Sequence, residues 1–250
     1  DDLEIFAYHG IAECFDRSGA WFGGITVTDG GGSARSGAYA SYSDDEMMQV
    51  RREEQNRAAG IGRYAFQAQL GYPSSAVKDP ALREQVAARI AGILDTARPD
   101  TLYLHNPFDK HLTHLAVLRA SLDALRSIPQ NALPAKVYGC EVWRDLDWLP
   151  DDLKVALPSD RHPGLARQLI EVFDSQVAGG KNYVAAALGR RAANATFFSS
   201  HSVDDAKALT FAVDLTPLIG PAAISLERFV EQPIRQFGSE VSASLAKLTA

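Results

Sequence analysis

The chain has few cysteines, no long apolar run and no cluster of basic residues. Only two cysteines occur among 250 residues, which argues against a disulfide framework and favours a reducing, cytoplasmic compartment. No uninterrupted apolar stretch approaches the roughly 18 residues that a membrane-spanning helix needs. The net charge of −6 and the lack of a basic stretch give a nucleic-acid partner no electrostatic support.

The composition is that of an ordinary folded domain. Hydrophobic residues make up 46% of the chain and charged residues 22%, as in typical globular proteins. The length is enough for one sizeable core. We therefore predict a single domain over residues 1–250.

Short apolar segments alternate with helical patterns along the chain. This alternation predicts an α/β, Rossmann-like, mostly parallel sheet with helices on both faces, and we expect its first strand to lie upstream of Asp1. Strands are expected over 24–29, 64–70, 101–105 and 136–142. Helices are expected over 5–15, 44–59, 80–97, 110–127, 164–177, 182–193 and from 223 to the C-terminus, the second beginning with a Ser-Asp-Asp-Glu capping box and the third with proline at its first position.

Candidate catalytic side chains follow two of these strands. Asp29 ends the first, and the segment Asp109–His114 follows the strand over 101–105. Ligands of parallel sheets bind outside the carboxyl ends of the strands. His111 and His114 are three residues apart, so they share a helix face. That spacing by itself fits either a metal site or two solvated histidines at the start of a helix.

Five segments resemble, in the same order, the signature of one family. Because all five are collinear, the set is far more specific than any single match. They are Asp1–Glu4 for His-Pro-Asp-Asp-x-Glu, Thr28–Gly30 for Thr-Asp-Gly, Arg51–Glu54 for Arg-x-x-Glu, Leu70–Pro73 for Leu-Gly-Tyr-x-Asp, and Asp109–His114 for Asp-x-His-Pro-Asp-His. The chain thereby resembles the PIG-L/LmbE-like zinc-dependent de-N-acetylases, which act on N-acetylglucosaminyl conjugates.

The resemblance implies a role for each matching residue. Asp2 and His114 would be ligands of Zn²⁺, Asp1 the general base that activates water, and His111 the general acid for the departing amine. Arg51 would bind substrate hydroxyls or an anionic aglycone. The expected reaction is removal of an N-acetyl group from an amino-sugar conjugate, with zinc as the cofactor and iron as a possible substitute.

The chain departs from the family pattern at three places. The signature histidine two residues before Asp1 is not part of the chain, which leaves two expected ligands where catalytic zinc sites usually have three; we expect residues upstream to supply it. Ser74 stands where the family often has an aspartate near the sugar. Leu112 and Thr113 replace Pro-Asp between the two histidines, a change that tunes the site rather than defines it.

Two other interpretations belong to different functional classes. One is a non-catalytic sugar-binding domain on the same fold, and the other is a phosphate-binding module that uses the glycine-rich turn at Gly30. For the deacetylase we expect a small-molecule substrate as the partner, no nucleic acid and no membrane span, and we leave a homo-oligomer open.

Further polar residues have both a structural and a functional interpretation. Asp29 is expected to cap its own turn, and His105 to be a packing histidine rather than a ligand. Glu141 follows a strand and is a candidate to face the crevice. Trp143 fits either sugar stacking or core packing. Arg191 fits either an anion site or a helix C-terminal charge, and we take the second as the default.

Overall fold

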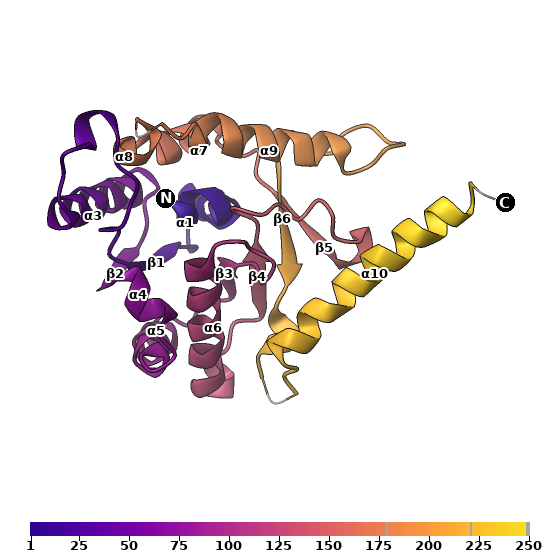
Figure 1. Ribbon diagram of the computed structural model, residues 1–250, viewed down its shortest axis with the longest axis horizontal. Helices are drawn as coiled ribbons and strands as arrows, with labels where there is room; N and C mark the ends of the chain where they lie inside the picture. Colours follow the sequence, from indigo (N-terminus) through magenta and orange to yellow (C-terminus); the bar gives the residue numbers. More distant parts are fainter. Residues whose placement is uncertain (179, 221, 249–250) are drawn as a thin grey trace. The chain divides into compact units, whose positions relative to one another are not determined.

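A computed structural model of the chain describes residues 1–250 except 179, 221 and 249–250 (Figure 1). Two compact units make up the structure, one from residues 1–89 and 157–210 and the other from residues 90–156 and 211–250. The elements, with η for 3-10 helices, are α1 (Asp2–Phe6), α2 (Tyr8–Phe15), β1 (Gly23–Thr28), η1 (Gly37–Tyr39), α3 (Asp44–Ile61), β2 (Phe66–Tyr72), α4 (Ser74–Lys78), α5 (Arg83–Ala97), β3 (Thr101–His105), α6 (Leu112–Ser127), η2 (Gln130–Ala132), β4 (Lys136–Cys140), η3 (Asp151–Leu153), β5 (Lys154–Pro158), α7 (Pro163–Glu171), α8 (Asp174–Val177), α9 (Tyr183–Phe197), β6 (Leu209–Asp214), η4 (Thr216–Leu218) and α10 (Leu226–Ala246).

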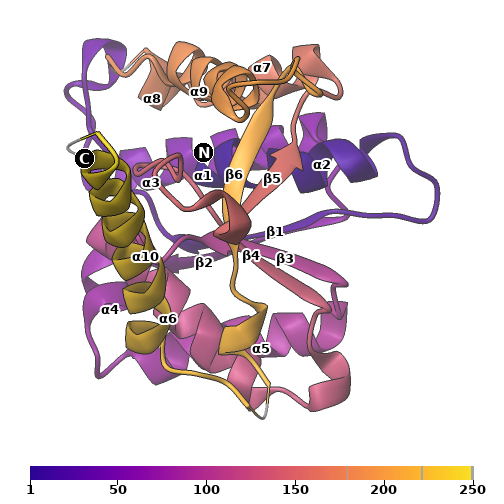
Figure 2. The same cartoon turned by 90° about the vertical axis from the view of Figure 1, so that its right-hand side faces the viewer.

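The first unit contains a parallel pair of strands and two groups of helices. β1 pairs with β2 in parallel register, from Gly23 opposite Phe66 to Thr26 opposite Gln69. Helix α3 packs on β2, while α7 contacts α1 and α3. In both views α7, α8 and α9 form a layer beside α1 and α3 (Figures 1 and 2). The Gln55 side chain of α3 donates to the Glu4 carboxylate of α1 at 2.9 Å, so α1, which begins at the predicted metal ligand Asp2, contacts the helix that carries Arg51.

Helix α3 begins where its capping signal predicts. The Ser43 hydroxyl accepts a hydrogen bond from the Glu46 backbone N–H at 3.3 Å, and the Glu46 carboxylate accepts one from the Ser43 N–H at 2.7 Å. The hydrogen bonds from Ser43 lower the pKa of Glu46. Such a cap satisfies two N–H groups that the helix cannot pair itself, and is worth about 1 kcal/mol.

The helix predicted over 164–177 is instead two helices, α7 and α8, separated at Phe173. Phe173 leaves helical geometry, with φ −85° and ψ 61°, and its ring is buried. The first N–H groups of a new helix need acceptors, and the Ser175 N–H finds one in the carboxylate of Glu54. A distant acidic residue thus stabilises a break that local periodicity did not predict.

The second unit contributes to a four-stranded sheet with the order β3-β4-β6-β5. β3 and β4 are parallel, and β4 and β6 are antiparallel. Helix α6 packs on β3. The predicted α/β class with parallel strands and covering helices is confirmed, although β5 and β6 were not predicted from the sequence. The prediction of a single domain over residues 1–250 stays a prediction.

The helix predicted to start at Pro80 begins at Arg83 instead. The Asp79 carboxylate accepts a hydrogen bond from the Ala81 N–H at 2.9 Å, and the Asp79 carbonyl accepts one from the Leu82 N–H at 3.1 Å. These bonds close a turn around Pro80, so the predicted helix start was wrong. Within the described ranges, no helix has both the length and the apolar character that crossing a bilayer requires.

Candidate active site

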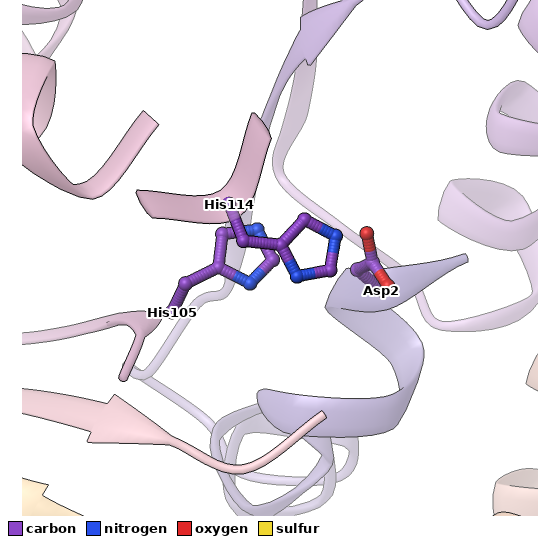
Figure 3. A group of neighbouring side chains, drawn as sticks. All are labelled: Asp2, His105 and His114. Atoms are coloured by element: carbon purple, nitrogen blue, oxygen red, sulfur yellow. The ribbon is translucent and has the colours of Figure 1, made fainter. Parts of the chain in front are cut away.

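Two histidines of the second unit lie face to face. His105 ends β3, and His114 lies in the first turn of α6. Their ring centroids are 3.9 Å apart and their planes differ by 14°. His105 is 9% exposed and His114 6%. Each offers a ring nitrogen as a possible metal ligand, and Figure 3 shows the two rings side by side.

The carboxylate of Asp109 organises this pair. One oxygen lies 3.3 Å from Nδ1 of His114, and the other accepts a hydrogen bond from the His111 N–H at 2.9 Å. The Trp143 N–H also donates to this carboxylate, at 3.3 Å. Burial raises the pKa of Asp109, but the hydrogen bonds from His114 and His111 outweigh burial and lower it. An ionised carboxylate on Nδ1 leaves Nε2 of His114 as the nitrogen suited to a metal.

His111 occupies the N-cap position of α6 and is exposed to solvent. Its ring centroid is 4.5 Å from that of His114 and 6.3 Å from that of Trp143, nearly parallel to the indole. The two predicted histidines therefore lie together, one buried and one exposed. An exposed imidazole can exchange protons with solvent, whereas a buried imidazole held by a carboxylate suits a fixed ligand.

In the first unit, the predicted residues Asp1 and Arg51 also lie together. Asp1 precedes α1 and Asp2 is its first residue. An Arg51 nitrogen, Nη2, lies 3.1 Å from the Asp1 carboxylate, and Nη1 lies 3.0 Å from the carboxylate of Glu54. The Arg51 side chain is 13% exposed, and its guanidinium group lies 5.3 Å from the centre of the Phe173 ring.

Two other candidates have structural partners. The Asp29 carboxylate accepts a hydrogen bond from the Gly31 N–H at 3.0 Å, so its predicted turn role is confirmed. Glu141 is buried and accepts from the N–H groups of Leu146 and Phe211. It therefore fixes backbone rather than facing a crevice, because buried carboxylates need donors.

The interpretation of Arg191 as a helix C-terminal charge was wrong. Helix α9 continues to Phe197, so Arg191 lies inside it. Its guanidinium group is buried, donates to the carbonyl oxygens of Glu4 and Ile5, and lies 4.6 Å from the Tyr8 ring centre. Arg191 thus ties α9 to α1.

Two residues that contact predicted site residues within their own unit were not proposed from the sequence. His105 was expected to be a packing histidine, although its position at the end of a parallel strand was a signal that it faces the site edge. Glu54 belongs to the Arg-x-x-Glu motif, and its spacing of three residues from Arg51 places both on one helix face. Its partner Ser175 is distant in sequence, so only folding reveals that contact.

The fold and these residues describe an α/β protein with histidine and carboxylate groups at the ends of parallel strands. Residues 1–125 match the family described as "PIG-L: GlcNAc-PI de-N-acetylase". The chain belongs to the PIG-L family. No curated protein sequence matches the chain.

Solved structures resemble the chain over most of its length. The conserved protein TT1542 from Thermus thermophilus has a TM-score of 0.62 and 16% identity, covering 90% of this chain and 94% of that one. N,N′-diacetylchitobiose deacetylase from Pyrococcus horikoshii has a TM-score of 0.58 and 14% identity, covering 84% and 79%. The 4-carboxy-2-hydroxymuconate hydratase GalB from Pseudomonas putida has a TM-score of 0.62 and 14% identity, covering 88% and 94%.

These similarities establish the fold, and the family match adds the class of reaction. Together with the deacetylase of this fold, the family supports a deacetylase-type hydrolase. The hydratase shows that the fold alone does not define the reaction. The reaction therefore depends on the side chains that the fold positions.

Proposed function

We propose that this protein is a zinc-dependent N-deacetylase that hydrolyses the N-acetyl group of an N-acetylglucosamine-type conjugate. The observation that carries the proposal is the buried His114, held by the Asp109 carboxylate and stacked on His105. A buried histidine whose ring is held by a carboxylate is typical of a metal ligand, and His105, on which it stacks, ends a parallel strand, where ligands bind. The family match over residues 1–125 supports the same chemistry.

The available donors fit zinc. His105 and His114 of the second unit would hold the ion, each offering one ring nitrogen, and Asp2 would be a further ligand, as the resemblance of Asp1–Glu4 to the family signature implies. Two imidazoles and a carboxylate form the kind of ligand set found in catalytic zinc sites, which keep a further position for water or substrate. Bound zinc would polarise the acetyl carbonyl and lower the pKa of water towards about 7.

The remaining residues would move protons. Asp1 would accept the proton of the attacking water, and its carboxylate lies 3.1 Å from Nη2 of Arg51. His111 would donate a proton to the leaving nitrogen, because amide cleavage needs a neutral amine as the product. Its exposure lets it take up another proton from solvent for the next turnover.

Arg51 would contact the substrate through a donor other than those directed at Asp1 and Glu54. A guanidinium group has five N–H donors, and the two ion pairs engage its Nη1 and Nη2 atoms. Hydroxyls or an anionic group of the aglycone are suitable acceptors.

The test is acetate release by the protein, including any residues that precede Asp1 in its natural sequence. The substrates are N-acetylglucosaminides with neutral, carboxylate and inositol aglycones. We expect release that chelation abolishes and zinc restores, and the preferred aglycone defines the substrate class. His201→Ala, at an exposed position of the first unit, is the control for His114→Ala.

Two other results would contradict the proposal. Sugar binding without zinc and without acetate release would indicate the non-catalytic sugar-binding domain. Zinc-dependent addition of water to an unsaturated carboxylate, without acetate release, would indicate chemistry like that of the hydratase of the same fold.

A further inference from the structure

Glu54 is a carboxylate with no exposed surface inside the first unit. A buried charge of this kind is costly unless it is paired and hydrogen-bonded. Two groups of Ser175 donate to it, the backbone N–H at 2.7 Å and the hydroxyl at 2.8 Å. Its third contact is Nη1 of Arg51 at 3.0 Å. Glu54 therefore joins the start of α8 to the Arg51 side chain.

Arg51 is confined on its other sides as well. Its guanidinium lies 5.3 Å from the centre of the buried Phe173 ring, a cation–π contact. Gly30 has φ +78°, and a Cβ there would lie 2.8 Å from Cγ of Arg51. The glycine of the Thr-Asp-Gly segment thus leaves the space that the arginine stem occupies.

Arg51 also contacts Asp1, because its Nη2 atom lies 3.1 Å from the Asp1 carboxylate. A planar guanidinium group joins two carboxylates in a fixed geometry that lysine cannot reproduce. The Asp1 side chain is 22% exposed, so without the Arg51 contact it would have room to adopt other rotamers. The contacts form one series from Ser175 through Glu54 and Arg51 to Asp1.

We propose that Glu54 is a positioning residue that, through Arg51, holds the Asp1 carboxylate in its catalytic orientation. The inference rests on the proposed function, in which Asp1 accepts the proton from water. Kinetic measurements can distinguish two roles of Arg51. Loss of Asp1 positioning lowers kcat, whereas loss of substrate binding raises KM.

The test compares Glu54→Gln with Glu53→Gln, an exposed neighbour on the same helix. Glutamine keeps the volume and an acceptor for Ser175, but it removes the charge that pairs with Arg51. We expect kcat for acetate release to fall about 10- to 100-fold in Glu54→Gln, with KM within about twofold and zinc content unchanged. Arg51→Lys should lower kcat similarly, and Glu53→Gln should match the wild-type protein.

An independent readout is the NMR signal of the Arg51 guanidinium, identified by its loss in Arg51→Lys. Restricted rotation of the guanidinium in the wild-type protein should be lost in Glu54→Gln and retained in Glu53→Gln. This measurement needs neither substrate nor metal. It reports on the contact itself rather than on general stability.

The outcomes distinguish this inference from the proposed function. Wild-type protein without acetate release overturns the proposed deacetylase function, and the positioning role of Glu54 with it. Active wild-type protein together with an unaltered kcat in Glu54→Gln overturns the positioning role alone. A rise in KM without a fall in kcat in both Glu54→Gln and Arg51→Lys also overturns it, because Arg51 then serves substrate binding.

Discussion

The imidazole rings of His105 and His114 stack in nearly parallel planes, with centroids 3.9 Å apart. Ring nitrogens lie in the plane of the imidazole, so stacking covers the faces and leaves the edges for ligation. The Asp109 carboxylate at Nδ1 of His114 fixes which edge that ring can offer. The pair is therefore suited to hold one ion rather than to fill space as two apolar rings would.

Replacing His114 should remove the metal. We expect His114→Ala to weaken zinc binding by at least about 100-fold, the upper end of what losing an outer-shell partner costs. Metal content after dialysis measures this directly, with the exposed His201→Ala as the control. Full zinc content in His114→Ala would contradict its role as a ligand.

His105→Phe separates ligation from packing. Phenylalanine keeps an aromatic face against His114 but has no ring nitrogen. If His105 only packs, its replacement should therefore leave zinc affinity unaltered. We expect zinc affinity to fall by about 10- to 100-fold, while the thermal unfolding midpoint of the metal-free protein stays near the wild-type value. An unchanged zinc affinity, measured by competition with a chelator, would support the packing role that the sequence predicts for His105.

Asp1→Asn should preserve the metal and abolish most turnover. The amide keeps the size of the side chain but cannot accept a proton as a base. General-base catalysis contributes about 10²- to 10⁴-fold, and we expect kcat to fall by that amount with zinc content unchanged. Near-normal acetate release by Asp1→Asn at saturating zinc would contradict the role of Asp1 as the general base.

His111→Ala should also lower turnover while the metal is retained. The exposed imidazole is proposed to protonate the leaving amine, a contribution of about 100-fold or more. An activated ester substrate, whose leaving group needs no proton, should be hydrolysed at nearly the wild-type rate. Loss of zinc in this variant would mean that His111 is a ligand instead.

Asp214 should make stability depend on acid pH. Burial raises its pKa, but hydrogen bonds from Thr216 and Lys136 outweigh burial and lower it. A carboxylate with a depressed folded-state pKa stabilises the protein above its unfolded value of about 3.9 and loses that contribution as pH falls through the folded pKa. We expect urea unfolding to show a smaller loss of stability between about pH 6 and pH 3 in Asp214→Asn than in the wild-type protein. The exposed Asp147→Asn should behave like the wild-type protein in the same comparison.

Local patterns were sufficient for much of the fold. The Ser43 capping box placed the start of α3, and the apolar segment ending at His105 placed β3, because both signals depend on neighbouring residues. The start of α5 and the continuity of α7 with α8 were wrong in the prediction. Before α5, Asp79 closes a turn. Between α7 and α8, Glu54 accepts a hydrogen bond from the Ser175 N–H, which is distant in sequence.

The sequence by itself determined the motifs: adjacent aspartates, the Arg-x-x-Glu spacing and two histidines on one helix turn. Family membership follows from these, since side-chain type and order are properties of the chain alone. Tertiary structure decided what each residue contacts. It stacked His105 on His114, removed Glu141 and Arg191 from the candidates by burying them against backbone groups, and linked Glu54 to both Ser175 and Arg51. These contacts join residues far apart in sequence, and such pairings arise only from packing, which no local pattern records.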